Sequence, residues 1–224
     1  MSFPTKVFPS ELDIQLDHSG TLLQGDLQLP DEAIGCVVFV HGSGSNRHSV
    51  RNQRVARMLR AHRIGTLLFD LLSEAEEVED AGSHSYRSDA EWLGDRVRQV
   101  TAWLGDRPEV SGLPFGYFGA GDGAAAALIA AARESVQGIV TRGGRADLAF
   151  EALPQVTAPT LLIVGGDDRE LIRLNWLAYE RLAGRKRVEV VPRASRLFEE
   201  AGKLEEVARL SAAWFTECFE GESR

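Results

Sequence analysis

Residues 119–123, GAGDG, form a pattern that could position a catalytic nucleophile. The apolar stretch PFGYFG (114–119) leads into them and the alanine-rich stretch AAAALIA (124–130) follows, which predicts a strand, a tight turn and a helix. In the nucleophile elbow, G-x-S-x-G, this arrangement exposes a serine hydroxyl at the tip of the turn. Here Gly121 stands at the serine position, so the turn offers no side-chain atom for attack on a substrate.

Other charged and hydroxyl residues occur in short segments that each follow an apolar stretch. These segments are HGSGSNRH (41–48), TRGGR (141–145), GGDD (165–168) and PRASRLF (192–198). In an open parallel sheet, ligands bind where the carboxyl ends of the strands meet the following loops. We therefore expect these segments to gather around the 119–123 turn.

The elements that must position these segments are eight strands and the helices between them. ELDIQLD (11–17) and TLLQGDLQLP (21–30) alternate apolar and polar residues, and the turn between them predicts a hairpin. The other six strands alternate with helical patterns, which predicts a mostly parallel sheet with helices on both faces. We expect a single domain over 1–224, with the hairpin of 1–30 in the same sheet. The acidic segment from Ser73 to about Ser88 is expected to be a solvated loop.

Four segments in this order, VVFVHGSGSNRHS, GYFGA-x-x-GAAAAL, TRGGR and LLIVGG, resemble the α/β-hydrolase fold. In detail the chain looks like the dienelactone-hydrolase-like branch, and the similarity runs from about residue 11 to the end. The resemblance implies an α/β-hydrolase core without a cap domain, and a triad in the order nucleophile, acid, histidine. Position by position, the triad sites are Gly121, Asp168 and Arg196, of which only the acid matches.

The resemblance also implies an oxyanion hole, formed by the backbone N–H groups of Ser43 and Asp122. Backbone donors do not depend on side chains, so this hole can persist without a nucleophile. It would lie at the start of the helix over 122–133, where an anion is favoured. Arginine at position 196 remains protonated near neutral pH and cannot accept a proton from a hydroxyl group. Ordinary triad hydrolysis is therefore expected to be absent.

Several charged residues have alternative interpretations. Arg196 is expected to form an ion pair with Asp168 in the place of the missing histidine, and in the alternative it points into the pocket and binds an anionic ligand. Arg142 either pairs with acidic loops or lines an anion pocket. Arg47 and His48 are expected near the pocket, where Ser43 or Ser45 with His48 could form a rerouted serine–histidine pair.

The composition limits the classes of partner. The net charge of −8, with basic residues scattered among acidic ones, disfavours binding to nucleic acid or to an anionic membrane. The longest apolar runs are strand-sized, and the N-terminal sequence lacks a signal-peptide profile, which together predict a cytoplasmic location. Cys36 and Cys218 form no C-x-x-C pair, so no metal or cofactor is expected.

These observations leave three hypotheses for function. The first is a family member with a degenerate triad that binds a small molecule, with an anionic ligand as one alternative, or a protein. The second is a hydrolase-fold enzyme with altered chemistry that involves no acyl-enzyme. The third is an inactivated or engineered variant of a carboxylesterase or dienelactone hydrolase. Whether the chain is an enzyme and what its oligomeric state is stay open at this point.

Overall fold

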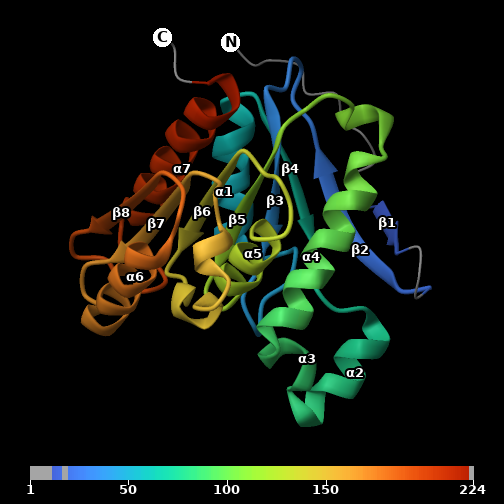
Figure 1. Cartoon of the computed structure of the whole chain (residues 1–224). Coiled ribbons are helices and arrows are strands. Elements are labelled where there is room, and N and C mark those ends of the chain that lie inside the picture. The colour runs from blue at the N-terminus through green and yellow to red at the C-terminus, as the bar shows by residue number, and fades with distance from the viewer. Residues whose placement is uncertain (1–11, 17–19, 222–224) are drawn as a thin grey trace.

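Figure 1 shows the computed structural model, which describes residues 12–16 and 20–221. Within them eight strands form one sheet, in the order β1-β2-β4-β3-β5-β6-β7-β8. The strands are β1 (Leu12–Gln15), β2 (Leu22–Gln28), β3 (Gly35–Val40), β4 (Ile64–Phe69), β5 (Phe115–Ala120), β6 (Gly138–Arg142), β7 (Thr160–Gly165) and β8 (Lys186–Val191). β1 and β2 form the predicted antiparallel hairpin, whose turn residues 17–19 lie outside the described part. The strands from β4 to β8 along the sheet are parallel. The predicted fold class is confirmed.

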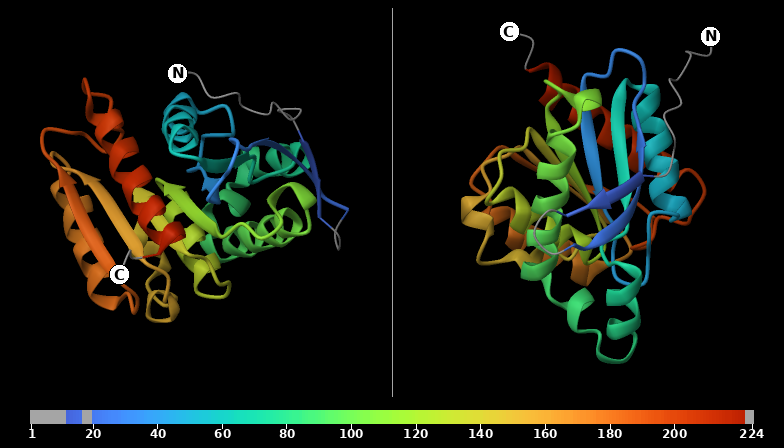
Figure 2. Two further views of the ribbon diagram at one scale, coloured as in Figure 1. Left: turned by 90° about the horizontal axis from the view of Figure 1, so that it is seen from above. Right: turned by 90° about the vertical axis from the view of Figure 1, so that its right-hand side faces the viewer.

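Helices cover both faces of the sheet, as predicted. They are α1 (Val50–Ala61), α2 (Glu74–Ser83), α3 (Ser85–Ser88), α4 (Ala90–Gly105), α5 (Gly123–Ala131), α6 (Arg169–Arg181) and α7 (Lys203–Glu220), with short 3-10 helices η1 (Pro108–Val110), η2 (Ala146–Ala149) and η3 (Leu153–Gln155). In the left view of Figure 2, α1 and α7 lie on one face of the sheet, and α4, α5 and α6 lie on the other. Each face has its own apolar core, because every side chain of the central strand β3 is buried and successive side chains alternate between the faces.

The strand order places the functional segments next to one another. After β3 the chain adds β4 on one side of it and then β5 on the other side. A reversal of this kind separates the loops at the carboxyl ends of the two strands and opens a crevice in which ligands bind. The segment after β3 and the turn after β5 therefore face each other at the edge of the sheet.

The acidic segment after β4 differs from the prediction, because it is helical and not a loop. Ser73 begins α2 with a capping box: its hydroxyl accepts the N–H of Glu76, and the Glu76 carboxylate accepts the N–H of Ser73. The short helix α3 follows after His84, whose backbone is left-handed with a φ of 53°. In Figure 1 this helical pair extends beyond the carboxyl edge of the sheet.

Candidate active site

The turn between β5 and α5, residues 119–123, has the geometry of a nucleophile elbow. We call these residues the elbow. Gly121 has a φ of 58°, the left-handed backbone that a nucleophile at this position must adopt. All residues of α5 are buried, so this apolar helix is fixed behind the turn.

The three elbow glycines differ in how much space a side chain would have. A Cβ at Gly119 would lie 2.6 Å from the Cα of Ala124, and a Cβ at Gly123 would overlap His41 O and lie 2.5 Å from Val40 O. Both positions therefore require glycine. A Cβ at Gly121 would meet only the Cα of Gly42, at 3.8 Å, so a side chain has room there. Gly121, at the predicted nucleophile position, has no side chain although the space for one remains.

The segment 41–49, which we call the oxyanion loop, packs directly on the elbow. A Cβ on Gly42 would lie 3.0 Å from Ala120 O and 3.5 Å from Asp122 N. His41 is buried and fixes this loop, because its Nε2 accepts the N–H of Leu71 at 3.1 Å. Among the described residues, neither the N–H of Ser43 nor that of Asp122 donates a hydrogen bond. Both groups are free to act as the donors of an oxyanion hole.

The acid position does not pair with the histidine position, so the expected Asp168–Arg196 ion pair is wrong. Asp168 is the N-cap of α6, and its Oδ1 accepts the N–H of Leu171 at 2.9 Å. Arg196 is exposed and places its Nη2 3.5 Å from Oδ1 of Asp122. The two loops do meet through the backbone, where the N–H of Asp167 donates to Ala194 O. The side chains pair elsewhere because the start of α6 satisfies Asp168 and the Asp122 carboxylate of the elbow lies within ion-pair distance of Arg196.

Asp122 links the elbow to the loops on both sides of it. Its Oδ2 accepts the hydroxyl of Ser43 at 2.5 Å, and its Oδ1 faces Arg196. Asp122 stands at the N-cap position of α5, but its side chain makes no capping hydrogen bond. The result is a chain of polar contacts from Ser43 through Asp122 to Arg196 beside the vacant nucleophile position.

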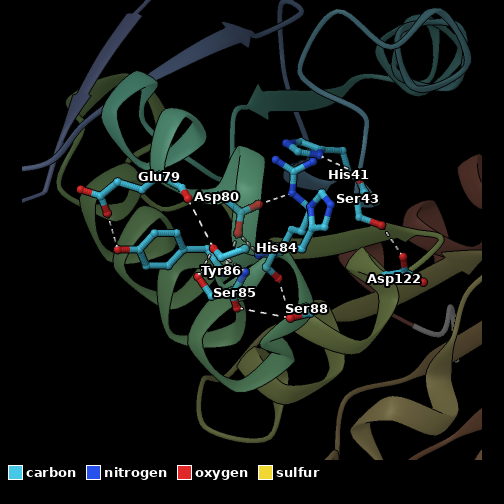
Figure 3. Close-up of polar contacts among 12 residues, drawn as sticks. His41, Ser43, Glu79, Asp80, His84, Ser85, Tyr86, Ser88 and Asp122 are labelled. Atoms are coloured by element: carbon cyan, nitrogen blue, oxygen red, sulfur yellow. Dashed lines mark hydrogen bonds and ion pairs between the residues drawn. The ribbon is translucent and has the colours of Figure 1, made fainter.

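A cleft lies over the elbow and has two parts. The inner part is a cavity of about 200 Å³ beside the oxyanion loop, and the outer part is a groove of about 560 Å³ toward α3 and η2. Ser43, Asp122, Arg87 and Leu93 line both parts. In Figure 3, Ser43 and Asp122 lie together on one side and His84 lies across from them. His84 lines the outer part, together with Leu148 at the far end.

Two ion pairs hold the helical wall of this cleft. Arg87 pairs with Asp80, whose carboxylate is fully buried and also accepts the N–H of Tyr86 at 2.7 Å. Arg96 in α4 forms a bidentate pair with Glu76 in α2, at 2.6 and 3.0 Å. Burial raises the pKa of Glu76, but the hydrogen bonds from Arg96 and Ser73 outweigh it, so the net pKa lies below its usual value. Both carboxylates are therefore ionised near neutral pH.

Three of the predicted binding residues do not line the cavity or the groove. Arg47 forms an ion pair with Asp70 at the end of β4 and so fixes the oxyanion loop. His48 is exposed, and its N–H donates to the side chain of Asn46 in the same loop. Arg142 is buried beside the elbow, where its carbonyl oxygen accepts the N–H of Gly121 at 3.3 Å. The rerouted pair of Ser43 with His48 is not present, because the Ser43 hydroxyl donates to Asp122.

The helical wall contributes cleft residues that were not among the predicted site residues. Glu77, His84 and Arg87 line the cleft, and all three belong to the segment that was expected to be a loop. The spacing Ser73-x-x-Glu76 is the sequence signal that could have indicated a helix there. Within the described part of the chain, no cluster of three or more His, Cys, Asp or Glu side chains could hold a metal ion.

Comparison with solved structures identifies close relatives of this geometry. A crystal structure of dienelactone hydrolase from Anabaena variabilis is 46% identical in sequence and has a TM-score of 0.89, covering 92% of this chain and 97% of that chain. A dienelactone hydrolase-like promiscuous phosphotriesterase from metagenomic libraries is 17% identical, with a TM-score of 0.76 and coverage of 93% and 98%. At this lower identity the likeness concerns the fold alone.

Comparison with curated proteins finds two relatives of greater length. Both are Mycobacterium tuberculosis proteins, from two strains, named "putative phosphoribosyl transferase", and each is 47% identical over 205 residues. The match covers 91% of this chain and 45% of each relative, so the chain spans less than half of their length. No family model matches the chain. Among the described helices, none combines the length and apolar character of a membrane span.

Proposed function

Because the chain belongs to the dienelactone hydrolase family of α/β-hydrolase fold proteins, we propose that it binds a small molecule in the family's cleft without covalent ester hydrolysis. The observation that carries the proposal is the conformation of the elbow. Gly121 has the left-handed backbone and the free space of a nucleophile position, but it has no atom that could attack a carbonyl carbon.

The groups around Gly121 support the same conclusion, because none of them replaces the missing proton-transfer chain. A serine hydrolase needs a neutral imidazole that takes the hydroxyl proton. Arg196 occupies the histidine position and pairs with Asp122, while Asp168 caps α6. The acid position therefore has a structural role that does not depend on a catalytic partner.

The charges that line the cleft favour an uncharged or cationic ligand with N–H or O–H donors. Glu77 and Asp122 contribute carboxylates to the lining, and Asp80 neutralises Arg87. The expectation of an anionic ligand in this cleft rested on Arg196 and Arg142, but Arg196 faces Asp122 and Arg142 does not line the cleft. A ligand that donates to these carboxylates and accepts from the N–H groups of Ser43 and Asp122, such as a primary amide, fits best.

A second candidate function is an enzyme with altered chemistry. It is favoured by the Ser43 hydroxyl, which donates to the Asp122 carboxylate at 2.5 Å inside the cleft. A hydroxyl on a carboxylate base that a third group orients has the arrangement of an activated nucleophile. In this candidate Ser43, and not position 121, would react with a substrate.

A fluorophosphonate probe distinguishes the two candidates, because it labels activated serine side chains. We expect no labelling of the wild-type chain and no hydrolysis of short-chain aryl esters. We expect labelling of the double variant Gly121→Ser/Arg196→His, because position 121 has space for the side chain and the oxyanion donors are free. Gly121→Ser alone is the matched control. Because it has no base, its labelling rate should be lower than that of the double variant by a factor of about 100 or more.

Three results would each contradict a part of the proposal. Labelling of the wild-type chain that disappears in Ser43→Ala would establish the second candidate. A folded double variant that stays unlabelled would mean that the oxyanion hole has also been lost. Thermal shift with acetamide and acetate, compared between wild type and Asp122→Asn, tests the ligand class. We expect stabilisation by acetamide only, and a preference for acetate in the wild type would overturn it.

The name of the mycobacterial relatives suggests a transferase activity, which we do not extend to this chain. The matched part is 45% of those proteins and folds here as an α/β hydrolase. An acidic cleft repels the phosphate groups of a phosphoribosyl donor. We infer that the activity in that name belongs to the rest of their length, and that incubation of this chain with phosphoribosyl diphosphate releases no pyrophosphate.

A further inference from the structure

Arg142, at the carboxyl end of β6, is a buried cation that has no anionic partner among the described residues. Its side chain is 6% exposed, and it forms no ion pair in the part of the chain that the structure covers. Its Nη1 is buried and has no hydrogen-bond partner. A buried charge without a partner is costly, so proteins normally pair it or neutralise it.

The surroundings of Arg142 add positive charge. Burial, and then repulsion from Arg51, lower the pKa of Arg142 to about 10, which leaves its guanidinium protonated at neutral pH. Arg51 lies in the first turn of α1, where its Nη1 donates to Oε1 of Glu199 at 2.9 Å and its Nε is buried without a partner. That first turn contains no acidic residue that could offset the positive end of the helix dipole. The unpaired guanidinium of Arg142 and the guanidinium of Arg51, which is paired with Glu199, therefore lie near the same helix start.

This region is distinct from the cleft. Side chains alternate between the faces of a strand, and Val140 belongs to the core beneath α1 and α7, so Arg142 points to the same face. Helix α5 lies on the other face of the sheet, and Arg142 lines neither part of the cleft. The backbone of Arg196 covers the adjacent residue, since a Cβ on Gly143 would overlap Arg196 O. Arg142 is thus enclosed between the sheet, α1 and the loop of the histidine position.

We propose that Arg142 binds a small anion, either a halide ion or a single carboxylate group, in the interior between the end of β6 and the first turn of α1. The guanidinium supplies hydrogen-bond donors and charge, and Arg51 adds a second donor. Because Arg142 is only 6% exposed, the site favours a small anion over a phosphorylated metabolite. The site goes beyond the proposed cleft function and does not depend on it.

Thermal unfolding at constant ionic strength tests this site. Chloride, bromide or acetate is titrated against the bulky anion p-toluenesulfonate, which maintains the ionic strength. We expect each small anion that binds to raise the Tm of the wild type by about 2–4 °C. The variant Arg142→Gln should lose this shift. Arg145→Gln is the matched control, because Arg145 lies in the same loop but is partly exposed and paired with Asp147.

The comparison of anions also separates the two sources of the ligand. A shift with halides and not with acetate identifies an inorganic ion, and the reverse result identifies a carboxylate. The proposal is overturned if no small anion stabilises the wild type, or if Arg142→Gln shows the same shift. If Arg142→Gln does not fold, crystals of the wild type grown in bromide decide. An anomalous peak within about 3.5 Å of Nη1 supports the site, and a water molecule there overturns it.

Discussion

The elbow and the loop that carries the histidine position, residues 192–198, differ in what fixes them. The elbow is held by backbone contacts: a Cβ at Gly119 or Gly123 would collide with the main chain of Ala124 or His41. The 192–198 loop is also packed by its backbone, with Phe198 buried, but Arg196 itself is exposed. The elbow restricts positions 119 and 123 to glycine, whereas the 192–198 loop leaves position 196 free to change.

This difference explains why the architecture of an active site can outlast its chemistry. A glycine at which an added Cβ would strike the backbone cannot be replaced unless whole helices or strands shift. Positions 121 and 196 face open space, so their residues can be replaced at little cost in stability. The backbone N–H groups of Ser43 and Asp122 belong to the fixed framework, whereas position 121 has no side chain and has open space around it.

The strongest test of this comparison substitutes alanine at two elbow glycines. Gly123→Ala should lower the free energy of unfolding by about 3 kcal/mol, because its Cβ overlaps the backbone of the oxyanion loop. Gly121→Ala should cost only about 1 kcal/mol, which is the cost of a left-handed backbone for a residue with a Cβ. Urea unfolding measures both values. Equal losses at the two positions would contradict the steric distinction.

A second test uses the two histidines of the oxyanion loop. Burial lowers the pKa of His41, although a hydrogen bond to Gly42 and the charge of Asp70 act in the opposite direction. Because the folded pKa lies below the unfolded value of about 6.5, stability is full above that pH and falls as the pH drops below it. The slope cannot exceed about 1.4 kcal/mol per pH unit for one proton. Urea unfolding between about pH 5 and 7.5 measures this slope, because histidine titrates in roughly that pH range.

His41→Gln should remove this pH dependence, because glutamine does not titrate. His48→Gln is the matched control, since His48 is exposed on the same loop and should leave the slope unchanged. A slope that survives in His41→Gln would show that another group titrates in this range. The oxyanion loop would then not depend on a neutral His41.

The smallest expected effect is at the histidine position. Arg196→Gln should change the free energy of unfolding by less than about 0.5 kcal/mol, because its contact with Asp122 is exposed and 3.5 Å long. Urea unfolding in low and high salt measures this contribution. A loss of about 2 kcal/mol or more is the effect expected for a buried ion pair. It would mean that the contacts from Ser43 through Asp122 to Arg196 stabilise the site and that the comparison is wrong.

The sequence predicts the framework of this molecule well, for a physical reason. Strands buried on both faces, such as β3 and β7, read as continuous apolar runs, and the alternation with helices determines the sheet type. The positions of Gly121, Asp168 and Arg196 on their loops follow from the same order of elements. Asp70 and Asp122 show where such reasoning stops, because sequence order does not determine which of several carboxylates an arginine will meet.

The side-chain partners could not be derived from the sequence. Asp168 pairs with the start of its own helix, and Arg196 reaches Asp122 across the elbow, since each side chain takes the nearest partner in space. The helical wall with Asp80 and Arg87 was also not predicted, because acidic residues that are considered without their partners suggest a solvated loop. The burial of Asp80 depends on Arg87, seven residues further along the chain, and this contact forms only when α2 and α3 pack.

The open space at Gly121 has a consequence for how this chain can change over generations. Some glycine codons differ from serine codons by one nucleotide, and the same holds for arginine and histidine. Because the elbow already has the required backbone and the free space, a serine at position 121 and a histidine at position 196 each require only one amino-acid substitution. Selection for ester hydrolysis could therefore begin from this scaffold without any insertion, deletion or rearrangement of the fold.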